Sequence, residues 1–273
     1  IQPNSGTQAN QIVYNAILNT GDTVLALNPK DGGHISHTKL GCRDIRPIYF
    51  SLNKNLEIDY EMLENQIINE KPKLVIVGAS SYIKEFDYQK IYTITSRYKV
   101  PLMADICHSV LYIMGNIHKN IFPFVDFATF TMDKLLCGPQ GGVIVYKDEY
   151  DSKIGTSIFP KTQGGPIQNS LFSKTMCFLK LSSMNVEEYA KSIIDNTNLM
   201  INVLKTQNIK TINDIAENHI ILVDVTTNGI SGKIAEEMLY KHGVLVNRNQ
   251  IPNDKQSALI TSGIRIGTVP ITN

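Results

Sequence analysis

The sequence is poor in the residues that build disulfide frameworks and zinc sites. It has no tryptophan and four cysteines among 273 residues, and the cysteines are Cys42, Cys107, Cys137 and Cys177. They form neither a CxxC pair nor the spacing of a zinc site. We therefore expect free thiols in a reducing compartment and no metal site.

An excess of charge of either sign is also missing, and so is any long apolar run. The formal net charge is +1, so no basic surface is available for a nucleic acid or an acidic membrane. The longest apolar runs, such as KLVIVGA (73–79) and VLYIM (110–114), are far shorter than the roughly 20 residues that cross a bilayer. We interpret both runs as buried strands, and we expect no nucleic-acid and no membrane partner.

Several common catalytic motifs are absent as well. The chain contains no GxxxxGK[ST], no GxGxxG and no HExxH, so P-loop, dinucleotide-binding and zinc-protease mechanisms lack their residues. The sequence starts at Ile1 without a methionine and stops at Asn273 shortly after a glycine-rich motif. We expect a piece of a longer protein, with any targeting signal outside this sequence.

What the sequence does contain is an alternation of strand and helix patterns. Short apolar runs alternate with amphipathic stretches of helical spacing, at 5–18, 23–27, 59–70, 73–79, 88–98, 101–106, 126–132 and 142–147. This alternation predicts an α/β fold in which a mostly parallel sheet is flanked by helices on both faces.

The pattern changes near residue 180. One long helix is predicted over 185–207, and shorter strand and helix patterns follow at 219–225, 234–241, 244–249 and 263–267. We therefore expect a large domain over 1–182, and a connecting helix with part of a smaller α/β domain over 183–273.

Polar residues collect at the predicted strand ends, where open parallel sheets bind their ligands. These residues are Ser5, Gly6 and Thr7 before the first helix, His34, Ser80, Asp105 with His108, and Thr131, Asp133 and Lys134. Taken singly, each has a simpler explanation, such as a helix N-cap, a strand-end acid, a core histidine or a surface lysine.

Taken together, these residue types fit pyridoxal phosphate better than other chemistries. A helix N-terminus binds the phosphate, an acid pairs with the pyridinium nitrogen, a flat ring stacks on the pyridine, and a lysine forms a Schiff base with the aldehyde. Lys134 and Asp105 lie at the ends of two predicted strands.

A series of motifs runs along nearly the whole chain. In order they are NSGTQAN, GDTVLAL, GGHISH, IDY, KPKLVIVGASSY, MADICH, TFTMDKLLCGPQGG, FPKTQGGP, NHIILVDV, SGKIAEE, VNRNQIPND and TSGIRIGT. In this order they resemble the serine hydroxymethyltransferase family. The resemblance implies the large domain of a fold type I pyridoxal-phosphate enzyme followed by part of its small domain, without the family's N-terminal segment and C-terminal tail.

The resemblance assigns roles to individual residues. Lys134 matches the Schiff-base lysine, Asp105 the acid at the pyridine nitrogen, and His34 the histidine that stacks on the ring. Cofactor binding is completed by the phosphate turn Ser5, Gly6 and Thr7, by Ser80 and His108 near the phenolic oxygen, by Thr131, and by Gly164 and Gly165, which match a loop that reaches the neighbouring subunit's phosphate.

Two further residues match positions that contact substrates. Arg265 matches the arginine that holds the substrate carboxylate, for which the guanidinium fork is suited, and Asn249 matches a folate-contacting position. The implied reaction interconverts serine and glycine and transfers a one-carbon unit to or from tetrahydrofolate. The resemblance also implies a homodimer or homotetramer with shared active sites, in the cytoplasm or the mitochondrion, and a catalytic glutamate and tyrosine from an N-terminal region that this sequence lacks.

The sequence departs from the family pattern close to the expected site. Asp133 replaces the histidine before the lysine, and an acid there favours the ammonium form, whereas the free amine attacks an aldehyde. Gln140 replaces the arginine of GPRGG, and MADICHSVLYIMG differs from the family's DMAHIAGL. The remaining departures are Leu135 for a threonine, Pro29 for a folate-contacting leucine, and a shorter flap in HTKLGCRDIRPIYF (37–50).

Three hypotheses are therefore open. The first is a working, divergent serine hydroxymethyltransferase. The second is a catalytically weak or inactive family member that acts as a cofactor-binding or partner subunit. The third is a related pyridoxal-phosphate enzyme, such as an aldolase, with another substrate. The joint presence of Lys134, Asp105, His34 and Arg265 favours the first, and Asp133, Gln140 and the flap favour the second.

Overall fold

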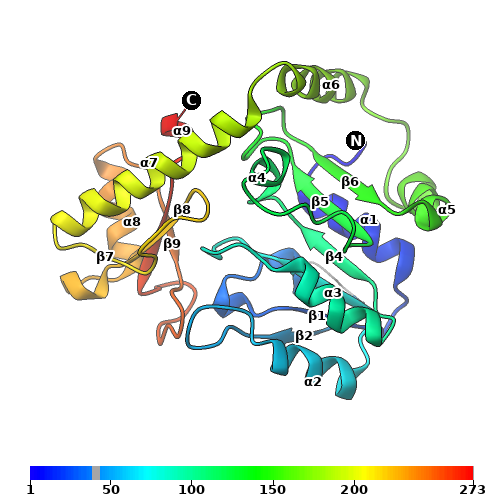
Figure 1. Cartoon of the computed structure of the whole chain (residues 1–273), viewed down its shortest axis with the longest axis horizontal. Helices are drawn as coiled ribbons and strands as arrows, with labels where there is room; N and C mark the ends of the chain where they lie inside the picture. The colour runs from blue at the N-terminus through cyan, green and yellow to red at the C-terminus, as the bar shows by residue number, and fades with distance from the viewer. Residues whose placement is uncertain (39–43, 273) are drawn as a thin grey trace.

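A computed structural model describes residues 1–38 and 44–272 and contains two β-sheets (Figure 1). The larger, six-stranded sheet has the order β2-β1-β3-β4-β5-β6. Its strands are β1 Thr23–Leu27, β2 Arg46–Phe50, β3 Leu74–Gly78, β4 Leu102–Asp105, β5 Phe127–Thr131 and β6 Gly142–Tyr146. All neighbours pair in parallel except β5 and β6, so the carboxyl ends of β1, β3, β4 and β5 meet at one edge.

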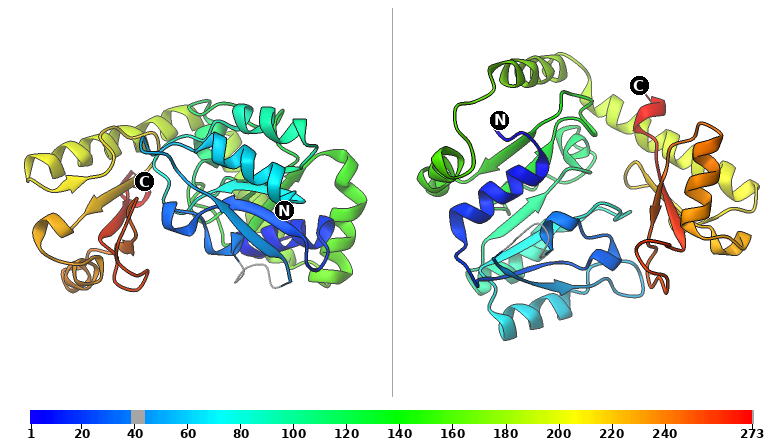
Figure 2. Two further views of the ribbon diagram at one scale, coloured as in Figure 1. Left: turned by 90° about the horizontal axis from the view of Figure 1, so that it is seen from below. Right: turned by 180° about the vertical axis from the view of Figure 1, so that it is seen from behind.

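Helices cover both faces of this sheet, because its strands bury side chains alternately on each side. The helices of this part are α1 Gly6–Ile17, α2 Tyr60–Glu70, α3 Tyr88–Arg97, α4 Val110–Met114, α5 Asp151–Thr156 and α6 Gln168–Ser182. Residues such as Leu25, Val75 and Ala104 face a core with α2, α3 and α4, whereas Val24 and Ile76 face a core with α1 and α5. The two views in Figures 1 and 2 show α1 on the side opposite α3 and α4.

The chain then crosses to a smaller unit along α7 Val186–Thr206, the long helix that joins the two parts in Figures 1 and 2. A four-stranded antiparallel sheet follows with the order β7-β8-β10-β9. Its elements are β7 Lys210–Thr211, β8 Ile220–Asp224, α8 Gly232–Lys241, β9 Asn247–Asn249, β10 Gly263–Gly267 and α9 Val269–Thr272. The expected boundary between 182 and 183 stays a prediction and falls in the turn between α6 and α7.

Short turns complete the chain. They are η1 Pro29–Asp31, η2 Ile35–His37, η3 Asp148–Tyr150 and η5 Thr226–Asn228, together with the π-type segment η4 Ser157–Thr162. Within the described ranges, no helix combines the length and the apolar character needed to span a membrane.

Side-chain caps explain where most of the longer helices begin. Ser5, Asp59, Asp87, Asn185 and Ser231 each accept a hydrogen bond from the backbone N–H three residues ahead. Each cap satisfies one of the free N–H groups at a helix start. The cap at Ser5 matters most for the site, because it fixes the N-terminus of α1 at the sheet edge.

The expected fold class is confirmed, and one predicted element is wrong. VLYIM (110–114), which we interpreted as a buried strand, forms α4. Val110, Leu111, Tyr112 and Ile113 are all buried, and such a short run shows neither a two-residue nor a helical period. The backbone N–H of Val110 bonds the carbonyl of Ile106 at 2.8 Å, which starts a helix directly after β4.

A buried lysine ties the first residues of the chain to the sheet. Lys174 of α6 is fully buried, and its Nζ donates to the carbonyls of Ile1 at 2.8 Å, Pro3 at 2.6 Å and Gly142 at 3.4 Å. Burial lowers the pKa of Lys174. These contacts anchor the segment that leads into α1, and thus help to place the start of that helix.

Candidate active site

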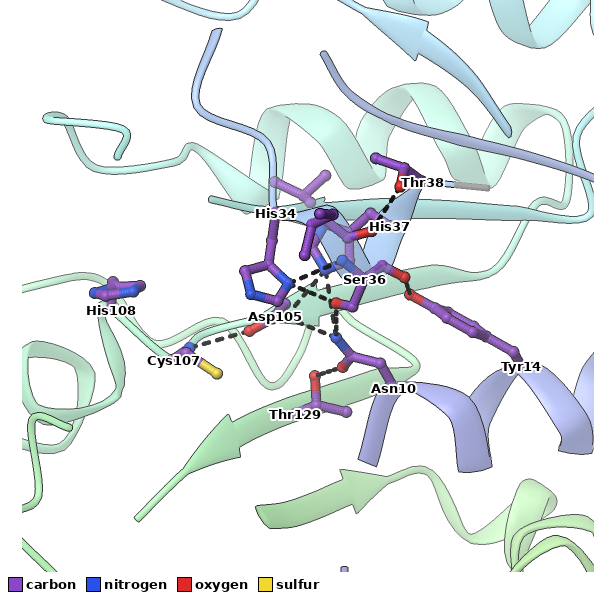
Figure 3. Close-up of polar contacts among 12 residues, drawn as sticks. Asn10, Tyr14, His34, Ser36, His37, Thr38, Asp105, Cys107, His108 and Thr129 are labelled. Carbon is purple, nitrogen blue, oxygen red and sulfur yellow. Dashed lines mark hydrogen bonds and ion pairs between the residues drawn. The ribbon is translucent and has the colours of Figure 1, made fainter. Parts of the chain in front are cut away.

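The predicted strand-end residues come together where β4, β5 and the start of α1 meet. Asp105 is the last residue of β4, Lys134 follows β5, and Gly6 begins α1. Asp105, Lys134 and Arg265 all act electrostatically on His34, so four residues that lie far apart in the sequence share one site. Figure 3 shows His34, His37 and Asn10 around Asp105.

Asp105 is a buried carboxylate held in its ionised form. Its Oδ2 accepts hydrogen bonds from His37 Nε2 at 3.0 Å and Asn10 Nδ2 at 2.8 Å, and its Oδ1 accepts from the backbone N–H of Cys107 at 3.3 Å. Burial raises the pKa of Asp105, but the hydrogen bonds and the charge of His37 outweigh it and leave the pKa well below its ordinary value.

A second layer of side chains orients these partners. Thr129 Oγ1 donates to Asn10 Oδ1 at 2.6 Å, and Asn10 Nδ2 also donates to Ser36 Oγ at 2.9 Å. Sequence reasoning missed Asn10, His37 and Thr129. Asn10 lies one helical turn after Gly6, and His37 one turn after His34, and that spacing was the available signal.

His34 is neutral and lies beside the buried carboxylate. Its Nδ1 lies 2.6 Å from Ser36 Oγ and accepts from the Ser36 backbone N–H at 3.1 Å. Burial is the main cause that lowers the pKa of His34; Asp105 opposes the shift, His37, Lys134 and Arg265 add to it, and the net pKa is about 4. A neutral, flat ring next to Asp105 is suited to stacking on an aromatic ligand.

Lys134 contacts a histidine and not the neighbouring acid. Its Nζ lies 3.2 Å from His108 Nε2. Asp133 is exposed, and no ion pair between Asp133 and Lys134 occurs in the described part of the chain. The expectation that Asp133 holds the amine as an ammonium is therefore not supported by this geometry.

The N-terminus of α1 approaches the end of β5 closely. Ser5 Oγ caps the helix by accepting from the Gln8 N–H at 3.1 Å, and Gly6 and Thr7 are its first residues. A Cβ on Gly6 would lie 2.6 Å from Thr131 Cγ2, so only glycine fits there without a shift. The free N–H groups of this first turn are suited to an anion.

Arg265 reaches from the small unit back to the large one. The guanidinium in β10 donates to the Ser80 carbonyl at 2.5 Å and to Asn247 Oδ1 at 3.1 Å. Burial lowers its pKa. Ser80, which follows β3, therefore contacts the arginine through its backbone carbonyl. Asn249 lies in β9 and pairs with Gly263, and its side chain bonds the Gln250 carbonyl and not the arginine.

Five other predicted positions form no hydrogen bond with these residues in the part of the chain that the structure describes. Gly164 and Gly165 are exposed in the loop before α6, and Gln140 is exposed before β6. Leu135 is buried, and Pro29 begins η1. Of the flap over 37–50, Lys39, Leu40, Gly41, Cys42 and Arg43 lie outside the described residues.

His34, His37 and Asp105 also present three possible metal ligands within 4.8 Å of one another. His34 Nδ1, His37 Nε2 and both carboxylate oxygens of Asp105 are, however, engaged with each other or with Asn10, Ser36 and Cys107. This arrangement orients a carboxylate and a ring, and the absence of a metal stays a prediction.

Comparison with known proteins identifies the family. The serine hydroxymethyltransferase family model matches residues 1–273. The chain is 37% identical over 275 positions to a serine hydroxymethyltransferase of Thiobacillus denitrificans and 36% identical over 275 positions to one of Methylobacillus flagellatus. Each comparison covers 100% of this chain and 66% of the relative, so the chain spans slightly less than two thirds of the length of these proteins. The chain belongs to the serine hydroxymethyltransferase family.

Proposed function

We propose that this protein is a glycine hydroxymethyltransferase that uses pyridoxal phosphate to interconvert serine and glycine, with tetrahydrofolate as the one-carbon carrier. The observation that carries the proposal is the ionised, buried Asp105 in one site with the amine of Lys134 and the neutral ring of His34. The family membership supports it across the whole chain.

The donor set fits pyridoxal phosphate by its chemistry. Lys134 supplies an amine for the aldehyde, and Asp105 supplies an anion that stays ionised and keeps the pyridine nitrogen protonated. Ser5, Gly6 and Thr7 supply the helix N-terminus for the phosphate, next to Thr131. When bound, the cofactor supplies an electron sink for the charge left at the substrate Cα.

The other residues orient reactants and hold protons. With the cofactor bound, His34 would stack on the pyridine, and Ser80 and His108 would contact the phenolic oxygen. Arg265 binds the substrate carboxylate. Its partners in this structure are a backbone carbonyl and an amide oxygen, and both are weaker hydrogen-bond acceptors than a carboxylate. Asn249 contacts the folate from β9.

The proposed assembly is a homodimer or homotetramer in which Gly164 and Gly165 reach the phosphate of the neighbouring subunit. Both glycines are exposed, and no atom lies within 4 Å of the place that a Cβ would take on either of them. Both glycines therefore lie on the surface, as contact with a neighbouring subunit requires. The compartment, cytoplasm or mitochondrion, stays a prediction.

The first experiment tests the cofactor. Purified protein mixed with pyridoxal phosphate should show a visible absorbance band, and borohydride reduction should leave the pyridoxyl group on Lys134 in a peptide map. Lys134→Arg should lose both signals, whereas Lys180→Arg, an exposed lysine of α6, should keep them. A label on another lysine contradicts the assignment.

The second experiment separates activity from cofactor binding. Protein that carries the cofactor should form glycine from serine in the presence of tetrahydrofolate. If the label is on Lys134 but no glycine forms, the catalytically weak or inactive alternative is correct. Changing Asp133→His and Gln140→Arg together should raise the affinity for pyridoxal phosphate, because the two changes remove one negative charge and add one positive charge in the segment that follows β5.

A further inference from the structure

Lys174 of α6 is fully buried, and its partners are all backbone carbonyls. Among the residues that the structure describes, it forms no ion pair with a carboxylate. A carbonyl oxygen can only accept a hydrogen bond, so Lys174 is the donor in each contact. Lysine is rarely buried in this way, and the position of its three acceptors indicates what the burial achieves.

The three carbonyls belong to the two segments that meet at the start of α1. Those of Ile1 and Pro3 lie just before the N-cap Ser5, and that of Gly142 lies at the start of β6. The Pro3 carbonyl also accepts from the Gly142 N–H at 2.8 Å. Lys174 therefore joins three parts of the chain, α6, β6 and the segment that leads into α1, and Figures 1 and 2 show the N-terminus beside β6.

Two glycines allow this close packing. A Cβ on Gly141 would overlap Lys174 Cε, and a Cβ on Gly142 would overlap the carbonyl oxygen of Ser5. That carbonyl accepts from the Ala9 N–H at 3.0 Å inside α1. The lysine and the first turn of the helix are thus held against the same pair of glycines.

The contacts of Lys174 fix the direction in which the chain enters α1. Without them, residues 1–3 would keep two hydrogen bonds to the rest of the chain, from the Gly142 N–H to the Pro3 carbonyl and from Gln163 Nε2 to the Gln2 carbonyl. The free N–H groups of the first turn bind an anion only when they point at it together. A looser segment before Ser5 would spread their directions.

We propose that Lys174 is a positioning residue for phosphate binding, which holds residues 1–3 on β6 so that the first turn of α1 presents its N–H groups to a phosphoryl group. The lysine acts through the backbone of this segment. The inference deepens the proposed function and rests on it for the identity of the ligand, pyridoxal phosphate.

A comparison of two ligands tests the proposal. Pyridoxal has the ring and the aldehyde of pyridoxal phosphate but no phosphate, so the ratio of the two affinities reports on the phosphate turn. We expect Lys174→Met to weaken binding of pyridoxal phosphate about tenfold and that of pyridoxal less than about twofold, because one hydrogen-bonded anchor of the phosphate turn is lost. Absorbance titration measures both affinities. An equal loss for both ligands, or no loss for either, overturns the proposal.

Gly141→Ala is an independent variant, because its Cβ displaces the lysine side chain without removing it. It should show the same selective loss of affinity for pyridoxal phosphate, and it decides the test if circular dichroism shows that Lys174→Met does not fold. Lys180→Met, at an exposed lysine of the same helix, is the matched control and should bind both ligands normally. A selective loss in this control as large as in Lys174→Met contradicts the proposal.

Hydrogen exchange tests the positioning step without any cofactor. In ligand-free Lys174→Met, mass spectrometry should show amides of peptides 1–14 and 140–146 that exchange about tenfold faster than in the unmodified protein, since local opening becomes easier. A peptide that covers α3 should exchange equally in both proteins. Unchanged exchange in the first two peptides overturns the proposal.

The outcome is distinguishable from failure of the proposed function. If the unmodified protein forms no absorbance band with either ligand, the proposed function fails, and hydrogen exchange still decides whether Lys174 positions the start of α1. If the cofactor is bound to Lys134 and Lys174→Met leaves the ratio of affinities unchanged, only this inference fails.

Discussion

Three histidines of the site are kept neutral by their surroundings, and this makes the stability of the protein depend on pH. The pKa of His34 is lowered to about 4 and that of His219 to about 3, mainly by burial, and that of His108 also lies well below its ordinary value. In the unfolded chain all three have pKa values of about 6.5. Between about pH 6.5 and 4 the unfolded chain therefore binds protons that the folded chain does not, so the free energy of unfolding falls as the pH falls.

Urea unfolding at pH 7, 6 and 5 measures this loss. We expect His219→Gln to reduce the slope of the unfolding free energy against pH by about one proton, which is about 1.4 kcal/mol per pH unit. His242→Gln is the control, because His242 is exposed at the end of α8. The lowered pKa of Asp105 does not interfere, since its contribution is lost only below about pH 4. Equal slopes for the two variants would show that His219 does not titrate in this way.

At the scale of elements, the site depends on how closely α1 approaches β5. A Cβ on Gly6 would lie 2.6 Å from Thr131 Cγ2, so Gly6→Ala should displace the helix N-terminus from the strand end. We expect at least about a tenfold loss of affinity for pyridoxal phosphate with the fold retained, because the N–H groups of that turn bind the phosphate. Absorbance titration measures the affinity, and circular dichroism checks the fold.

The control for this change is Gly155→Ala in α5, where no atom lies within 4 Å of the added Cβ. Alanine favours a helix over glycine by about 1 kcal/mol, so this variant should bind the cofactor normally and be slightly more stable. If Gly6→Ala also binds normally, the start of α1 is not the phosphate site.

The sequence predicted those elements in which apolar residues recur at a clear period and in which turn or capping residues mark the ends. The expected ranges 23–27 and 263–267 agree with β1 and β10, and most other predicted elements differ by one or two residues at the ends. The pattern failed at VLYIM, where four consecutive buried residues, 110–113, leave no period. It also did not predict α6, whose apolar residues Phe172, Met176 and Leu179 face outward.

The sequence predicted the candidate site because ligand-binding residues collect at strand ends. It did not predict the hydrogen bonds that support these residues, because those bonds join distant parts of the chain. His37 and Asp105 are 68 positions apart, Asn10 and Asp105 are 95 apart, and His108 and His219 are 111 apart. Spacing along one element carries no information about such pairs, which depend on the order of the strands in the sheet.

At the scale of the whole molecule, one helix face indicates an assembly. Phe172, Met176 and Leu179 of α6 have exposed fractions of 68%, 49% and 57%, and their spacing places them on one side of the helix. The exposed Gly164 and Gly165 lie just before this helix. Because contiguous exposed apolar residues mark interaction surfaces, we predict that this face binds a second copy of the chain.

Sedimentation velocity tests the assembly. The double change Phe172→Glu with Met176→Glu should shift the protein from dimer to monomer, because four carboxylates would then be buried at the two-fold interface without partners. The monomer should also bind pyridoxal phosphate more weakly, since the Gly164–Gly165 loop would no longer reach the phosphate of the neighbouring subunit. Leu199→Glu, at a residue of α7 that is 62% exposed, should leave the dimer intact. A dimer that survives the double change places the interface elsewhere, and a monomer with unchanged cofactor affinity removes the glycine loop from the shared site.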